Sequence, residues 1–132
     1  YNATFGAEKQ LTIPYQPTFS RRDAHPSCLY GGASLAALVH LGRSKGYCCI
    51  GTNTAGNNAY FLRDELVDSL PFEPPEQPFR EAAFRESRDV AGRLTQLRGL
   101  ARLEAIKELP VVDLQAGRER RIGEVFGLSG AD

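Results

Sequence analysis

The segment from Ala33 to Leu66 constrains the fold more than any other part of the chain. It reads ASLAALVHLGRSKGYCCIGTNTAGNNAYFLRDEL. Its first third has apolar residues at helical spacing, and Ser34 stands where such a helix would begin. Two strand-like runs, Tyr47–Ile50 and Ala59–Leu62, then flank a turn rich in Asn and Gly. The segment therefore predicts one helix that runs into an antiparallel hairpin.

The helix and the turn have recognisable ends. Gly42 or Gly46 is expected to end the helix, because glycine adopts the left-handed conformation common after a last helical turn. The turn spans residues 52–58, and we interpret its three Asn residues as positions that tolerate positive φ.

Composition indicates a globular domain without a general affinity for polyanions. The chain has 132 residues, 42% of them hydrophobic and 24% charged, which is enough for one core. Lys plus Arg and Asp plus Glu each number 16, so no general nucleic-acid or membrane-surface partner is expected. Arg118, Arg120 and Arg121 cluster near the end. We interpret them as a solvated tail, with a phosphate-binding patch as the alternative.

The cysteines point to a reducing compartment. There are three, and the adjacent Cys48 and Cys49 would face opposite sides of a strand. They form neither a CxxC metal motif nor a disulfide framework, so we expect free thiols, no metal site and a cytoplasmic location. No signal peptide and no run long enough for a membrane span are expected.

The regions around the central segment are less regular. Residues 1–32 are expected to form a long ordered loop with a short extended piece at Leu11–Pro14, fixed by Tyr15, Phe19 and Tyr30. The proline-rich run Phe72–Pro78 is the best boundary, dividing the chain into parts 1–71 and 72–132.

The second part predicts a small α+β appendage. A hairpin is expected around Asp89–Gly92, and a helix from Leu100 to Leu109 that Pro110 stops. A last strand–turn–strand is expected over residues 111–122.

The central segment also resembles a known family. Its helix, its Gly46–Tyr47 junction and its Asn/Gly turn are similar to the closing segment of FkbM-type S-adenosylmethionine-dependent methyltransferases. Tyr1–Asn2 resembles the tail of the preceding strand, and FREAAFRESRDVAGRLTQL resembles an appendage of a bacterial, uncharacterised subgroup. The resemblance implies an α/β fold class in which residues 1–71 are the C-terminal part of a Rossmann-like sheet, closed by the antiparallel hairpin.

The cofactor motif of that family does not occur in this chain. Such enzymes bind S-adenosylmethionine at a glycine-rich turn between a strand and a helix. Gly31 and Gly32 precede a helix here but follow a loop. The resemblance therefore implies that S-adenosylmethionine binds upstream of Tyr1, and that the substrate lies near Tyr1–Asn2 and Gly31, at the carboxyl ends of strands.

The candidate site residues lie in the first loop. His25 is the candidate general base and Asp23 the residue that orients it, because histidine titrates near neutral pH. Asn2, Tyr30, Gly31 and Gly32 are candidate substrate-binding residues, the glycines through backbone amides at a helix N-terminus. The alternatives are a loop histidine that packs or caps, and glycines that only permit a tight turn.

Three functions remain open from the sequence. The first is part of a methyltransferase that acts on a small-molecule or glycan-like substrate. The second is a non-catalytic module that assembles through an open sheet edge, with its own copies among the expected partners. The third is a small-molecule-binding domain that uses residues 31–34.

Overall fold

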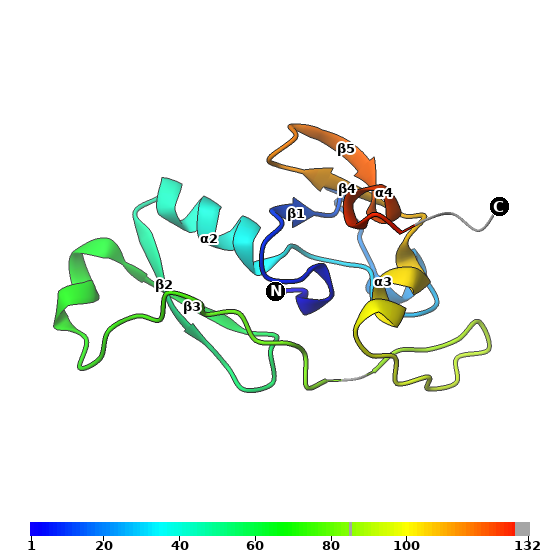
Figure 1. Cartoon of the computed structure of the whole chain (residues 1–132), viewed down its shortest axis with the longest axis horizontal. Coiled ribbons are helices and arrows are strands. Elements are labelled where there is room, and N and C mark those ends of the chain that lie inside the picture. Colours follow the sequence, from blue (N-terminus) through cyan, green and yellow to red (C-terminus); the bar gives the residue numbers. More distant parts are fainter. Residues whose placement is uncertain (85, 129–132) are drawn as a thin grey trace.

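A computed structural model describes residues 1–84 and 86–128 (Figure 1). These residues form a mixed α/β fold with two small antiparallel sheets, one of three strands and one of two. The expected mixed α/β class is therefore confirmed. Every pair of named strands in the described residues is antiparallel, so this part of the chain does not itself contain the parallel strands of a Rossmann-like sheet.

The three-stranded sheet joins the two ends of the described chain. Its order is β1 (Leu11–Thr12), β4 (Pro110–Asp113) and β5 (Arg118–Arg121). The expected extended piece and the expected last hairpin both form. They pair with each other, with Leu11 opposite Asp113, which local sequence signals did not indicate.

The central segment folds as predicted, into α2 (Leu35–Ser44), β2 (Tyr47–Thr52) and β3 (Ala59–Arg63). Gly46, with φ of 78°, follows the helix as the expected terminating glycine. Gly42 lies inside the helix instead, and its lack of a side chain leaves room for Phe61 on β3, whose ring would be 3.1 Å from a Cβ at this position.

The remaining helices are short. They are η1 (Ala3–Phe5), α1 (Arg21–Ala24), η2 (Asp64–Ser69), α3 (Leu100–Ile106) and α4 (Ile122–Phe126). The predicted helix from Leu100 is α3, but it ends at Ile106 and not at Leu109, and a turn over residues 107–109 leads to Pro110, the first residue of β4. The predicted hairpin around 89–92 is reduced to a turn and a single bridge between Arg88 and Leu94.

The hydrophobic core draws on both ends of the described sequence. Its buried cluster combines residues from η1, β1 and the following loop with residues from α3, β4 and α4, namely Phe5, Leu11, Leu29, Tyr30, Ile106, Val111, Ile122 and Val125. The core thus crosses the boundary expected near residue 72. Figure 1 shows α2 and the β2–β3 hairpin on one side of the molecule, away from α3 and α4.

Two expectations about loop residues are wrong. Tyr15 does not hold the first loop, because it is 90% exposed, whereas Tyr30 and Phe19 do pack into or against the core. No Asn of the hairpin turn has a positive φ. Asn53 is used for its side chain instead, since its Oδ1 accepts hydrogen bonds from the amides of Asn57 and Asn58 at 3.1 and 3.0 Å.

The arginine cluster forms a strand and not a tail, but Arg118 and Arg121 are exposed, as a solvated cluster would be. Arg118, Arg120 and Arg121 all belong to β5. Arg120 pairs with Asp113 at 3.1 Å, and Arg121 pairs with Glu108 at 2.9 Å. None of the helices in the described residues has the length and apolar character of a membrane-spanning segment.

Candidate functional site

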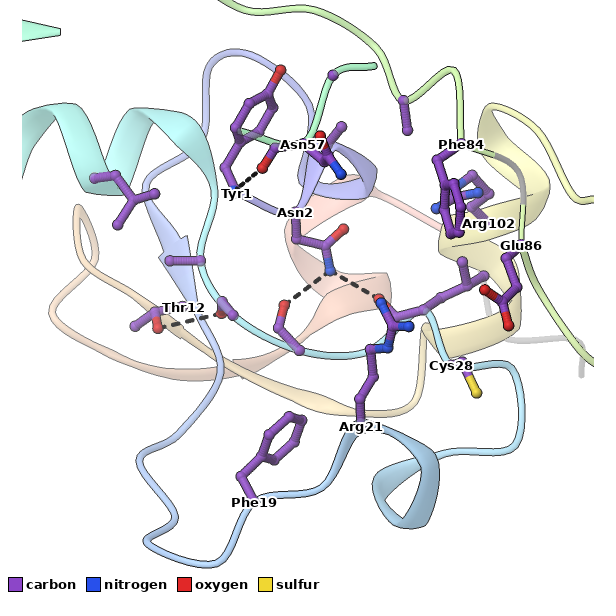
Figure 2. A pocket seen from close by; sticks show the side chains of 18 residues that line it. Tyr1, Asn2, Thr12, Phe19, Arg21, Cys28, Asn57, Phe84, Glu86 and Arg102 are labelled. Carbon is purple, nitrogen blue, oxygen red and sulfur yellow. Dashed lines mark hydrogen bonds between the residues drawn. The ribbon is translucent and has the colours of Figure 1, made fainter. Parts of the chain in front are cut away.

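A cavity of about 790 Å³ lies between the start of the chain, the hairpin turn and α3 (Figure 2). Three of the candidate substrate-binding residues, Asn2, Gly31 and Gly32, line it. Arg21 of α1 and Arg102 of α3 also line it. The cavity therefore brings together parts of the chain that are about 100 residues apart in sequence.

Asn2 shapes the floor of this cavity. Its Nδ2 donates hydrogen bonds to the carbonyl oxygens of Leu29 at 2.8 Å and Gly31 at 3.0 Å. Its Oδ1 caps η1 by accepting from the amide of Thr4 at 3.0 Å. Both amide hydrogens are thus already engaged, so Asn2 holds residues 29–31 in place and does not offer a free donor.

The two glycines have different requirements. A Cβ on Gly31 would meet Cζ of Phe19 at 3.3 Å and Cγ of Arg21 at 3.8 Å, so glycine lets both side chains lie against the floor. Gly32 has a φ of 65°, and its carbonyl oxygen accepts from the amide of Ile13 at 3.0 Å. Residues 31–33 therefore pair with the end of β1 and also connect to the start of α2.

The first turn of α2 is already capped from within the chain. Ser34 is fully buried, and its Oγ accepts from the amide of Ala37 at 3.1 Å and from the amide of Leu11 at 3.0 Å. One of the amides that could hold an anion at this helix terminus is therefore occupied.

The side chains that line the cavity carry more positive than negative charge. Arg102 is partly buried, its Nε donates to Oγ1 of Thr4 at 3.1 Å, and burial lowers the pKa of its guanidinium. Glu86 also lines the cavity but forms an ion pair with Arg88 at 3.2 Å. Within residues 1–84 and 86–128, no side-chain hydrogen bond or ion pair engages the guanidinium of Arg21, which is exposed.

His25 and Asp23 do not line the cavity. Nδ1 of His25 accepts from the amide of Ser27 at 3.2 Å and lies 2.8 Å from its hydroxyl, and burial lowers the pKa of the imidazole. Asp23 is exposed on α1, and no described hydrogen bond joins it to His25. The structure brings neither side chain to the substrate-binding candidates, and their catalytic roles stay predictions.

Tyr30 also points away from the cavity, into the core. Its hydroxyl donates to the carbonyl oxygen of Pro110 at 2.6 Å, and its ring meets that of Phe19 edge-on with centroids 6.4 Å apart. Burial, and then the charge of Glu119, raise the pKa of Tyr30. Its contacts are those of a structural residue that ties the first loop to β4.

Sequence patterns did not indicate Arg21, Arg102 or Phe84 as site residues. Arg102 lies on a short amphipathic helix, where an arginine is an ordinary surface residue. Its position in the cavity depends on contact with Thr4, 98 residues earlier. The left-handed backbone of Cys28, with φ of 60°, is a further feature of the cavity wall that sequence spacing cannot reveal.

The glycine-rich turn at which the resembled family binds its cofactor does not occur in the described residues. They contain no group of three His, Cys, Asp or Glu side chains that could hold a metal ion. Gly31 and Gly32 follow a loop that pairs with β1, and they do not form a glycine-rich turn between a strand and a helix. These residues therefore do not fit S-adenosylmethionine in the manner of the resembled family.

No family model, curated protein or solved structure matches this chain.

Proposed function

We propose that this chain is the sheet-closing, substrate-side part of a cytoplasmic S-adenosylmethionine-dependent methyltransferase that acts on a small molecule or glycan-like acceptor. The observation that carries the proposal is the α2–β2–β3 unit, a helix packed on an antiparallel hairpin. Among the described strands, β2 and β3 pair only with each other. A helix followed by such a hairpin is how the resembled family completes its sheet.

The hairpin has the burial expected of an unfinished sheet. Cys49 is its only buried residue, whereas Tyr47 and Tyr60 are 36% and 51% exposed. Two-stranded sheets are at best marginally stable in water without further strands or a covering layer, and here α2 is the helix that packs on the hairpin. Strands outside residues 1–132 would extend this small sheet.

The cavity supports a substrate-side role. It lies beside Tyr1–Asn2 and residues 31–33, where the resemblance puts the carboxyl end of a sheet strand. Ligands of open α/β sheets bind at that edge. In this proposal Asn2, Gly31 and Gly32 line the acceptor site, and Asn2 contributes by holding residues 29–31 in place. His25 and Asp23 keep their candidate roles as general base and orienting group.

The proposal puts S-adenosylmethionine outside this chain, because the residues present do not fit it. The chain's own contribution is to bind and orient the acceptor and to shield it from water. A glycine-rich strand–turn–helix in the coding sequence upstream of Tyr1 supports this arrangement, and a start codon directly before Tyr1 contradicts it.

Calorimetric titration with S-adenosylmethionine tests the proposal. Residues 1–132 alone should release no binding heat, and the complete gene product should bind with a stoichiometry of one. Tight binding by residues 1–132 would disprove the upstream cofactor site. Failure of the complete gene product to bind would disprove the methyltransferase itself.

A second candidate is a non-catalytic assembly module, which the unpaired edges of β2 and β3 favour. Such edges invite pairing with another chain, including a second copy of this one. Light scattering after size exclusion distinguishes the two. A stable dimer of a complete gene product that does not bind S-adenosylmethionine supports assembly, and a monomer opposes it.

A further inference from the structure

We infer that the cavity around Arg21 and Arg102 binds the carboxylate or phosphate group of a small organic molecule that also carries a flat apolar part. The inference rests on the proposed function and deepens it, since it names the chemical class of the acceptor substrate.

The first support is the excess of positive charge on the cavity wall. Arg21 and Arg102 contribute two guanidinium groups, and Glu86 is the one carboxylate among the described lining residues. Glu86 is already paired with Arg88, which is not part of the wall. Neither Arg21 nor Arg102 has a carboxylate partner in the described part of the chain, so a bound oxyanion would supply the missing countercharge.

The second support is the placement of the free donors. Figure 2 shows Arg21 reaching from α1 toward the middle of the cavity, with Arg102 at the end occupied by Phe84. Arg102 uses Nε and Nη1 for Thr4 and Leu97, which leaves Nη2 without a described partner. Planar guanidinium groups match carboxylate and phosphate oxygens in geometry as well as charge.

The partial burial of Arg102 also favours an anionic ligand. Partial burial disfavours the charged guanidinium and lowers its pKa, with no neighbouring acid to offset this cost. Bonds to Thr4 and Leu97 hold the side chain in place without neutralising it. A positioned but uncompensated charge beside a cavity is suited to an anionic ligand.

The apolar part of the ligand is indicated by the rest of the wall. Phe19 and Phe84 present aromatic rings, and Ala33 and Leu38 add aliphatic surface. Phe84 is 52% exposed, although a large aromatic side chain is normally covered. Ligand sites commonly combine such apolar walls with a few charged groups, in volumes of roughly 300–1,000 Å³.

The test is an NMR titration of ¹⁵N-labelled protein with three probes, phenyl phosphate, benzoate and benzyl alcohol. We expect at least one of the two anions to shift amides of residues 19–21, 29–33 and 100–102 at millimolar concentration. The neutral alcohol should bind at least tenfold more weakly, because it lacks the charge. The stronger of the two anions identifies phosphate or carboxylate as the preferred group.

Arg21→Gln is the decisive variant, and Arg22→Gln is its matched control. Both residues are exposed on α1, but only Arg21 lines the cavity, so folding should be unaffected in both. Arg21→Gln should weaken anion binding about tenfold, the effect expected for one charge-assisted hydrogen bond. Arg22→Gln should change it less than twofold.

Several results would overturn the inference. These are no binding of either anion, equal binding of benzyl alcohol, or equal effects of the two substitutions. The outcome is independent of the cofactor titration. Anion binding that depends on Arg21, in a gene product that does not bind S-adenosylmethionine, would retain this site and reject the methyltransferase.

Discussion

Asp113 shows how a single residue can close a hairpin. It ends β4, and its Oδ1 accepts from the amides of Gln115 and Ala116 at 3.1 and 3.0 Å. Its Oδ2 accepts from Nη1 of Arg120 at 3.1 Å. The amide of Ala116 above all, and then the guanidinium of Arg120, lower the pKa of this carboxyl.

The lowered pKa gives a signed dependence of stability on pH. The folded state favours the carboxylate of Asp113 more than the unfolded state does. Its stabilisation is therefore complete above the unfolded pKa of about 4 and is lost as pH falls through the lower folded pKa. Asp113→Asn should lower the urea midpoint at pH 7 and reduce the further loss below pH 4. Asp68→Asn, at an exposed position, is the control, and identical pH profiles would contradict the prediction.

Gly56 is a second residue whose identity the structure requires. Its φ is 69°, and a Cβ there would overlap the carbonyl oxygen of Glu81, which is backbone and cannot move aside freely. Gly92 has a similar φ of 79° with open space around it. Gly92→Ala should cost about 1 kcal/mol of unfolding free energy from conformation alone, and Gly56→Ala about 1–3 kcal/mol more from the clash. If urea denaturation gives the same loss of unfolding free energy for both variants, the backbone of residue 81 does not exclude a Cβ at position 56.

Among the elements, α2 and the β2–β3 hairpin were predictable because their signals are local. Ser34, Gly46 and the apolar spacing define the helix, and two short strand-like runs around a turn define β2 and β3. The role of Asn53 was not predictable in the same way. Asn both tolerates positive φ and caps turns with its side chain, and only the folded turn shows which property is used.

Ser34 links α2 to β1 through its hydroxyl oxygen. Its buried Oγ accepts from one amide in α2 and one in β1, so Ser34→Ala leaves two donors without a partner. We expect a loss of about 2–3 kcal/mol of unfolding free energy, from a lost helix cap and an unsatisfied buried amide. Ser44→Ala, at the exposed other end of α2, should change it by less than about 0.5 kcal/mol. A small effect of Ser34→Ala in thermal unfolding would show that water reaches these amides.

Across the whole molecule, sequence patterns could not predict the contacts between the first and the last elements of the described chain. The pairing of β1 with β4 and the shared core of residues 5–30 and 106–125 depend on contacts between distant segments. The cavity arises in the same way, because Arg21 and Arg102 become neighbours of one space only after folding. The boundary expected near residue 72 relied on prolines, whose local effect does not reveal that both parts share a core.

In the proposed methyltransferase, β2 and β3 close a larger sheet. Hydrogen exchange followed by mass spectrometry tests this directly on the hairpin peptides covering residues 47–63. In residues 1–132, the amides of β2 and β3 that face away from the partner strand should exchange rapidly, because no described strand pairs with them. In the complete gene product they should become strongly protected. Equally fast exchange in both proteins would contradict the claim.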